Sequence, residues 1–304
     1  MAEGPLSAEL ATQVQELAAA ATDADGVAPL SEDVLLQVRH GSGPHARDLV
    51  LTAADGTLAG YGHLDAPDPG GQEGDASGEL LVHPAFRRRG YGAALSAALT
   101  AGGPGVRLWA HGELPGAVGL AKAAGFARFR ALWQMRMPLA DVPAAELVLP
   151  AGVRLRTFRP GTDEEAWLTV NALAFSHHPE QGSWTLGDLK LREAEPWFDP
   201  AGFFLAERGG RVVGFHWTKV HAAGGADGGP IGEVYVVGVD PGQQGGGLGR
   251  ALTLAGLAYL RDRGLAEVML YADEDNTAAI RMYSALGFRR WSTDAMYRKA
   301  GTTA

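Results

Sequence analysis

The sequence contains no cysteine among its 304 residues. This absence excludes disulfide bonds, thiolate zinc ligands and a cysteine nucleophile. No apolar stretch approaches the ~18 uninterrupted residues of a membrane-spanning helix, and residues 1–30 lack the basic start of a signal peptide. Histidines and carboxylates do not recur at metal-ligand spacing. We therefore expect a cytoplasmic protein with no bound metal and no membrane partner.

Basic residues are also scarce: 26 Lys and Arg stand against 35 Asp and Glu, a net charge of −9. Nucleic-acid-binding proteins usually present a basic face, so a nucleic acid is not the expected main partner. A small anion needs only a local cluster of donors and stays compatible with this charge. With 46% hydrophobic residues the chain can form cores. We expect a monomer that acts on small molecules.

The chain contains an internal repeat. Residues 78–99, GELLVHPAFRRRGYGAALSAAL, correspond to residues 232–257, GEVYVVGVDPGQQGGGLGRALTLAGL. A second pair follows in the same order, AKAAGFARFR at 121–130 and YSALGFRRWS at 283–292. Two ordered matches indicate a tandem duplication. We expect domains at residues 1–140 and 152–304, with the junction near residues 141–152.

Each half alternates strands and helices, which predicts a mixed α/β fold with a central strand–loop–helix unit. In the first half we expect helices at 7–21, 31–39, 90–102 and 116–123, strands at 48–53, 57–64, 79–83 and 106–109, and a hairpin at 126–138. In the second half we expect strands at 153–158, 203–208, 211–219, 232–239 and 267–272, helices at 163–175, 185–194, 247–263 and 276–286, and terminal strands.

Two glycine loops, at residues 87–92 and 244–249, fit the pattern [RQ]-x-x-G-x-[GA]. Each follows a predicted strand and opens a predicted helix, where backbone N–H groups and the helix dipole favour an anion. A flexible turn is the ordinary alternative. The second loop is not a Walker loop, because Leu248 and Gly249 replace Lys and Ser/Thr, and Leu252 breaks a dinucleotide fingerprint.

The loop pattern resembles the GCN5-related N-acetyltransferase family, and the resemblance covers both halves. It implies two tandem acetyltransferase domains that use acetyl-CoA as co-substrate and no metal. In that family the loop binds the pyrophosphate and the preceding strand pairs with the pantetheine arm. The cofactor-binding residues implied here are Val237, Gly238, Val239, Gln244, Gly245, Gly246, Gly247, Leu248, Gly249, Arg250 and Asn276, with Leu80, Leu81, Val82, Arg88, Arg89, Gly90, Tyr91 and Gly92 in the first half.

Acetyl transfer to an amine needs a base and a stabilised leaving thiolate. Glu233 opens the predicted central strand and is our candidate base; by period two it shares a face with Val237 and Val239. The family places an Asn at the start of the next helix and a Tyr before a Gly-Phe pair, which implies Tyr283 as general acid. Asn276 also fits a helix N-cap. A surface glutamate and a core tyrosine are the ordinary alternatives.

The first half lacks these groups. Aligned on the repeat, Ala76 stands at the Glu233 position, Ala121 at the Tyr283 position and Leu114 at the Asn276 position. Its loop is nevertheless the more basic one. We therefore expect a non-catalytic first half that scaffolds or lines the substrate site, with Glu79 as a candidate replacement base.

Several segments, including WAHGEL, HPEQGSW, GFHWTKVH and LYADEDNTAAIRMYSALGF, resemble a two-domain actinobacterial branch of the family. That branch acetylates the cysteinyl amine of cysteinyl-glucosaminyl-inositol. The resemblance implies substrate contacts from Glu32, Glu180, Lys219, Glu233 and Tyr271, whereas Trp217 and His216 fit strand packing. Without cysteine, we expect direct transfer in a ternary complex. Another amine substrate, or a CoA-binding sensor without turnover, stays open.

Overall fold

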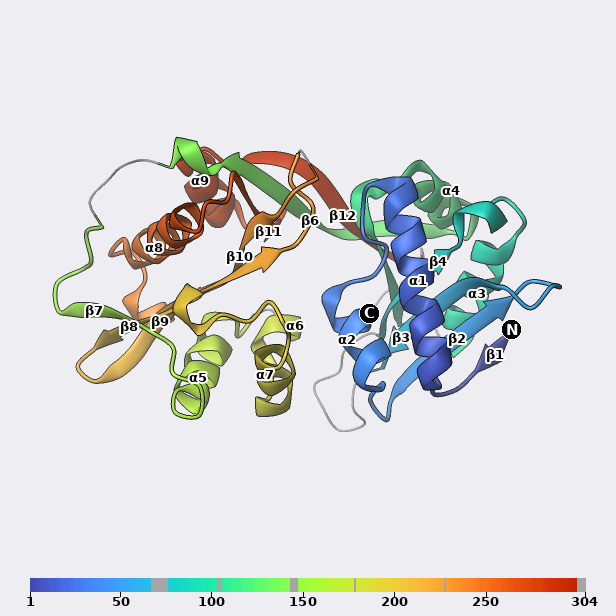
Figure 1. The fold of residues 1–304 in the computed structure, drawn as a ribbon, viewed down its shortest axis with the longest axis horizontal. Helices are drawn as coiled ribbons and strands as arrows, with labels where there is room; N and C mark the ends of the chain where they lie inside the picture. Colours follow the sequence, from blue (N-terminus) through green and yellow to red (C-terminus); the bar gives the residue numbers. More distant parts are fainter. Residues whose placement is uncertain (67–75, 103–104, 143–146, 178, 227, 300–304) are drawn as a thin grey trace. The chain divides into compact units, whose positions relative to one another are not determined.

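Each half of the chain forms a mixed sheet covered by helices (Figure 1). The structure, a computed structural model, describes residues 1–304 except 67–75, 103–104, 143–146, 178, 227 and 300–304. Unit 1 comprises Met1–Trp133 and Ser292–Ala304, and unit 2 comprises Gln134–Trp291. The expected division at 1–140 and 152–304 follows the repeat. The bounds of the units differ from this expected division because two strands, at residues 126–138 and 289–299, run from one unit into the other.

Unit 1 contains the first four helices and a sheet in the order β1-β2-β3-β4-β5-β12-β6. Its helices are α1 (Ala8–Asp25), α2 (Glu32–His40), α3 (Tyr91–Leu99) and α4 (Pro115–Ala123). Its strands are β1 (Ala2–Glu3), β2 (Ala46–Thr52), β3 (Leu58–Asp65), β4 (Ala76–Val82), β5 (Val106–Ala110) and the larger parts of β6 (Phe126–Pro138) and β12 (Arg289–Lys299). β4 and β5 are parallel, and β2, β3 and β4 are antiparallel.

Unit 2 repeats this arrangement with a sheet in the order β6-β11-β10-β9-β8-β7. Its strands are the end of β6, β7 (Val153–Thr157), β8 (Phe203–Arg208), β9 (Arg211–His221), β10 (Ile231–Val239) and β11 (Glu267–Asp273). Its helices are α5 (Glu164–Ala174), α6 (Pro179–Gly182), α7 (Leu186–Glu193), α8 (Leu248–Asp262) and α9 (Thr277–Leu286). β10 and β11 are parallel, as β4 and β5 are, so the topology bears out the repeat.

The predicted hairpin at 126–138 is wrong. These residues form one strand, β6, of 13 residues. Residues 127–137, ARFRALWQMRM, contain none of the Gly, Asn, Asp or Pro residues that form tight turns, so the chain has no place to reverse. β6 and β12 instead carry the chain from one unit to the other, and β12 is the antiparallel neighbour of β5 in unit 1, with Ala295 opposite Ala110.

Unit 1 encloses a buried polar network on β2 and β3. The Nδ1 atom of His63 lies 2.8 Å from Asp48 Oδ1, and its Nε2 atom lies 3.2 Å from Asp65 Oδ2. The Tyr61 hydroxyl donates to Asp48 at 2.5 Å. Burial alone would lower the pKa of His63, but the bonds to Asp48 and Asp65 outweigh it and raise that pKa to about 9. This network links the two strands that carry it.

Unit 2 packs helices on both faces of its sheet, with α5 and α8 on opposite sides of β8–β10 (Figure 1). On the α5 face an aromatic cluster includes Trp167, Phe203, Phe215 and Trp217, each fully buried. On the α8 face His216 is fully buried and its Nδ1 donates to the Leu252 carbonyl at 2.7 Å. His216 and Trp217 are therefore packing residues, as the sequence predicts.

Candidate functional site

The second glycine loop joins β10 to α8. Gly245 and Gly247 have φ of +83° and +81°, a region that disfavours side chains, and Gly247 is the N-cap of α8 without a side-chain cap. A Cβ atom built on Gly245, Gly246 or Gly247 meets nothing within 4 Å. Gln244 Nε2 donates to the Val239 carbonyl at 3.3 Å and closes the loop. The uncapped helix start fits a phosphate group.

The first glycine loop has the same conformation. Arg87 Nε donates to the Val82 carbonyl at 3.2 Å, as Gln244 does to Val239, and Arg88 and Gly90 have φ of +64° and +88°. Arg88 thus holds the left-handed conformation that Gly245 holds in unit 2. Arg87 also forms a bidentate ion pair with Asp25, at 2.7 and 2.6 Å, so its guanidinium group is already paired with a carboxylate of unit 1.

The strand before each loop separates from its parallel neighbour. Pairing between β10 and β11 covers Gly232–Val234, and pairing between β4 and β5 covers Ala76–Gly78. Val236–Val239 pair with β9 on their other side. A parallel pair that parts in this way frees backbone groups of β10 for a ligand. The geometry fits the pantetheine contact expected at Val237–Val239, and Leu80–Val82 lie at the matching place in β4.

A β-bulge in β10 overturns one prediction. Glu233 lies opposite Lys219 of β9, while Val237 lies opposite His216, and the register shifts between Val234 and Val236. Lys219 and His216 are an odd number of residues apart, so their side chains point to opposite faces. Glu233 therefore does not share a face with Val237 and Val239; the extra residue at the bulge reverses the alternation.

Glu233 is 7% exposed and accepts a hydrogen bond from His221 Nε2 at 2.6 Å. Burial alone would raise the pKa of this carboxyl. The hydrogen bond from His221 and the positive charges of His221 and Lys219 outweigh burial and lower the pKa of Glu233 below its ordinary value. Glu233 is thus an ionised carboxylate inside the protein, as a base must be before it accepts a proton.

Lys219 lies beside Glu233 on the same face of the sheet. Its Nζ atom is 4.3 Å from the centre of the Trp197 ring and 5.1 Å from that of Tyr235. The Tyr235 hydroxyl accepts from Arg192 Nε at 2.9 Å. The carboxylate is therefore flanked by an ammonium group and aromatic faces, which suits a polar cationic substrate with apolar ring surfaces.

Tyr283 and Asn276 lie on α9. Asn276 caps the helix, accepting from the Ala279 N–H at 3.0 Å, as predicted. Tyr283 is buried, and its ring meets that of Phe288 edge to face at 5.7 Å. Burial raises the pKa of Tyr283 to about 12, so the hydroxyl keeps its proton at neutral pH. It can therefore donate a hydrogen bond to a leaving thiolate.

The other predicted substrate residues lie in both units. Glu32 is the first residue of α2 in unit 1. Tyr271, on β11 of unit 2, is 41% exposed, and its hydroxyl accepts from Gln134 Nε2 at 2.7 Å. Glu180 belongs to α6, and its side chain lies outside the described residues. Lys219 and Glu233 are cross-strand partners within unit 2.

In unit 1, Asp65 of β3 occupies the position that Lys219 occupies in β9. The residue paired with Asp65 is Ser77, not the Ala76 that the repeat alignment places at the Glu233 position, because β4 pairs with β3 without a bulge. Ser77 is thus the structural counterpart of Glu233, and it carries no carboxylate. The Glu79 carboxylate accepts from the Ser31 N–H at 2.7 Å and lies 3.4 Å from His111 Nε2. Because both of its oxygens have partners, Glu79 fits a structural role rather than that of a replacement base.

Comparison with known proteins gives the family. A model of the acetyltransferase (GNAT) family matches residues 14–134 and 169–288, one segment in each half. The chain belongs to the GNAT acetyltransferase family. GNAT acetyltransferases use acetyl-CoA, and the two matched segments confirm the tandem GNAT fold predicted from the repeat.

The relatives of this GNAT chain match it almost from end to end. A protein of Thermobispora bispora named mycothiol acetyltransferase is 64% identical over 94% of this chain and 95% of its own length. One of Thermomonospora curvata with the same name is 60% identical, over 94% and 93%. Among solved structures, a GCN5-related N-acetyltransferase of Sphaerobacter thermophilus is 27% identical with a TM-score of 0.66, covering 98% and 95%.

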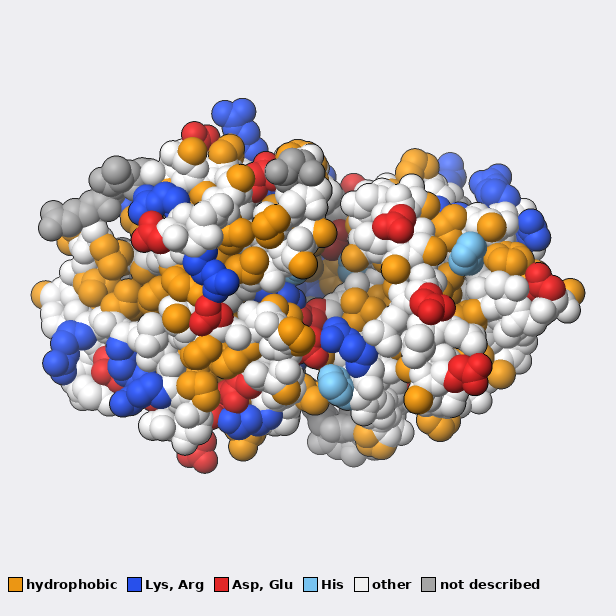
Figure 2. All heavy atoms as spheres, viewed as in Figure 1, with side chains coloured by type: hydrophobic (Ala, Val, Ile, Leu, Met, Phe, Trp, Pro, Cys, Tyr) orange, Lys and Arg blue, Asp and Glu red, His pale blue; other side chains and the backbone are white. Residues whose placement is uncertain are grey.

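A tandem GNAT protein from the clavulanic acid biosynthesis pathway shares the fold, with a TM-score of 0.72 at 23% identity over 100% of this chain and 99% of that one. Within the described part of this GNAT chain, no helix has the length and apolar character to cross a membrane. The same residues contain no cluster of three His, Cys, Asp or Glu side chains arranged for a metal ion. On the face seen in Figure 2, acidic and basic side chains are interspersed.

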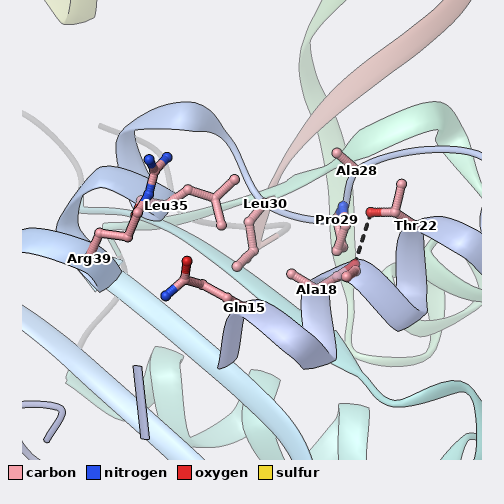
Figure 3. A pocket seen from close by; sticks show the side chains of 9 residues that line it. Gln15, Ala18, Thr22, Ala28, Pro29, Leu30, Leu35 and Arg39 are labelled. Atoms are coloured by element: carbon pink, nitrogen blue, oxygen red, sulfur yellow. Dashed lines mark hydrogen bonds between the residues drawn. The ribbon is translucent and has the colours of Figure 1, made fainter. Parts of the chain in front are cut away.

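Unit 1 also has a pocket of about 260 Å³ between α1, α2 and their connection. Figure 3 shows Gln15 and Arg39 at its rim, with Ala18, Leu30 and Leu35 supplying apolar walls. None of the predicted site residues lines this pocket. It is therefore distinct from the glycine loop of unit 1.

Sequence reasoning missed His221, the closest partner of Glu233. The signal was present: in a hairpin with Lys219 opposite Glu233, a residue two positions further along β9 lies diagonally across on the same face. To find His221 from sequence, one must know the register in which β9 pairs with β10, and the bulge at Val234–Val236 shifts that register.

Proposed function

We propose that this protein transfers the acetyl group of acetyl-CoA to the cysteinyl amine of cysteinyl-glucosaminyl-inositol, giving mycothiol. One observation carries the proposal: eight relatives named mycothiol acetyltransferase match at least 92% of this chain at 50–64% identity. The reaction would take place in the cytoplasm, catalysed by a monomer that binds two small molecules.

Acetyl-CoA binding is assigned to the loop and strand that precede α8. The uncapped N-terminus of α8, the glycines at 245–247 and the backbone of β10 after its separation from β11 support this assignment. The proposed contacts are Val237–Val239, Gln244–Arg250 and Asn276. The matching residues of unit 1, Leu80–Val82 and Arg88–Gly92, have the geometry for a similar ligand without a neighbouring acid and base.

Acetyl-CoA supplies the acetyl group as a thioester. Glu233 takes the proton of the substrate ammonium group, directly or through water, and leaves the neutral amine that attacks. Tyr283 hydrogen-bonds the departing sulfur. Since the pKa of Tyr283, about 12, lies above the ~8.5 of a thiol, a stabilising hydrogen bond describes its role better than full proton transfer. With no cysteine in the chain, transfer occurs directly in a ternary complex.

Substrate recognition is assigned to Glu32, Glu180, Lys219, Glu233 and Tyr271. A sugar–inositol substrate with many hydroxyls and one amine suits carboxylates and an ammonium group beside aromatic faces. In this proposal the second domain is catalytic, and the first is retained without catalytic groups and contributes Glu32.

The test is CoA release with cysteinyl-glucosaminyl-inositol and, as control, with glucosaminyl-inositol lacking the cysteine. We expect turnover with the first compound alone. Turnover with the control alone would refute the substrate assignment. Turnover confined to an aminoglycoside or a peptide N-terminus would mean a different amine. Acetyl-CoA binding without CoA release from any amine would identify a sensor.

A further inference from the structure

Glu233 receives its short hydrogen bond from a side chain that reaches the solvent. His221 is the last residue of β9, and its side chain is 29% exposed, whereas the Glu233 side chain is 9% exposed. Their Nε2 and Oε2 atoms are 2.6 Å apart. The other cation nearby, Lys219, lies over Trp197 and Tyr235. His221 donates directly to the carboxylate.

We propose that His221 is a positioning residue for acetyl transfer, which holds Glu233 ionised and fixes Oε2 so that Oε1 is left for the substrate amine. This role rests on the proposed function, in which Glu233 is the base. Glu233 and His221 are held together by the sheet: Lys219 pairs with Glu233, and His221 follows two residues later on the same face.

The environment of Glu233 explains why a partner is required. A carboxylate removed from water becomes neutral unless charges or donors compensate. Lys219 and His221 face it from β9, and the paired segment of β11, Val268–Leu270, has no titratable side chain. Histidine can donate from Nε2 in both its neutral and its protonated state. The hydrogen bond to Glu233 therefore needs only the N–H donor at His221, with or without a charge on the ring.

The experiment is the pH profile of kcat/KM for the full chain with cysteinyl-glucosaminyl-inositol. We compare the wild type with His221→Leu, which has no donor, and His221→Gln, which keeps an N–H donor. His177→Gln is the control, since His177 is an exposed histidine of the same unit. In His221→Leu the acidic limb of the profile should move up by about one pH unit or more, with activity regained at higher pH. His221→Gln should restore most of the wild-type position.

A uniform loss of activity in His221→Leu at every pH, with the limb in place, would overturn the proposal. His221→Ala serves as a second donor-free variant should the leucine variant fail to fold. Glu233→Gln is measured in parallel. If Glu233→Gln keeps wild-type activity, the base of the proposed function is wrong. If Glu233→Gln is inactive and the limb of the donor-free variants does not move, the role of His221 alone fails.

Discussion

Replacing Gly256 by Ala tests the packing of α8 on the sheet of unit 2. A Cβ atom at residue 256 would lie 2.0 Å from Cε1 and 2.2 Å from Nδ1 of His216. Nonbonded carbons settle near 3.5–4.0 Å, so the ring would have to withdraw by about 1.5 Å. The ring is fully buried, and burial lowers the pKa of His216 to about 4, so it is neutral and donates to the Leu252 carbonyl.

The expected cost combines two effects. Overpacking of a dense core costs about 1–3 kcal/mol, and loss of a buried hydrogen bond costs about 1–3 kcal/mol. Alanine recovers about 1 kcal/mol of helix propensity. We expect Gly256→Ala to lower the free energy of unfolding by about 1–5 kcal/mol, which lowers the Tm of a unit of this size by about 2–20 °C.

Thermal unfolding followed by circular dichroism measures this change. Gly119→Ala in α4 is the matched control, because its new methyl group meets nothing within 4 Å and the variant should keep or raise Tm. The double variant Gly256→Ala/His216→Ala should lose less than the sum of the two single variants, since the clash disappears. An unchanged or raised Tm in Gly256→Ala would refute the argument.

Three further outcomes are expected. Gly247→Ala should raise the KM for acetyl-CoA at least several-fold in steady-state kinetics, because residue 247 has a φ of +81° that alanine disfavours. Gly246→Ala is the control and should change this KM less, since residue 246 has no such φ. Equal effects of the two substitutions would contradict the loop assignment. Glu233→Gln and Tyr283→Phe should each lower kcat by about 10²–10⁴ while binding acetyl-CoA normally by calorimetry; an unchanged kcat removes that residue from the mechanism. The pKa of His63 is raised to about 9 from a reference near 6.5, so protonation of His63 stabilises unit 1. This stabilisation is complete below pH ~6.5 and is lost as the pH rises through 9. In urea titrations, the free energy of unfolding of the wild type should fall over that window, and His63→Gln should reduce the slope. The slope that stays belongs to His111 of unit 1, whose pKa, against the effect of burial, the Glu79 and Asp294 carboxylates raise to about 10.

The repeat made much of the fold predictable from sequence. Gly90 and Gly247 hold a left-handed backbone at the same place in the two loops, so the glycine pattern identified the loops correctly. The Asn276 cap was predictable for a similar reason, because a short polar side chain before a helix has one common use. Such signals are local: a few neighbouring residues determine the conformation.

The parts that could not be predicted depend on partners distant in sequence. Nothing in the letters VYVVG marks the bulge between Val234 and Val236, since valine and tyrosine suit regular and bulged strands alike. The face of Glu233 was therefore assigned wrongly. The hydrogen bond from His221 and the end of unit 2 at Trp291 were missed because both follow from strand pairing across the chain.

The passage of β6 from unit 1 into unit 2, and of β12 back into unit 1, affects how the protein folds during synthesis. Unit 1 obtains the second neighbour of β5, beside β4, from β12, which is synthesised after every strand of unit 2. Until then His111 lacks Asp294, whose carboxylate it meets at 3.0 Å, and the edge of β5 is open to other strands. The first half of this protein thus completes its folding after the second half has been made, and a gene cut between the repeats would yield a first half with an exposed sheet edge.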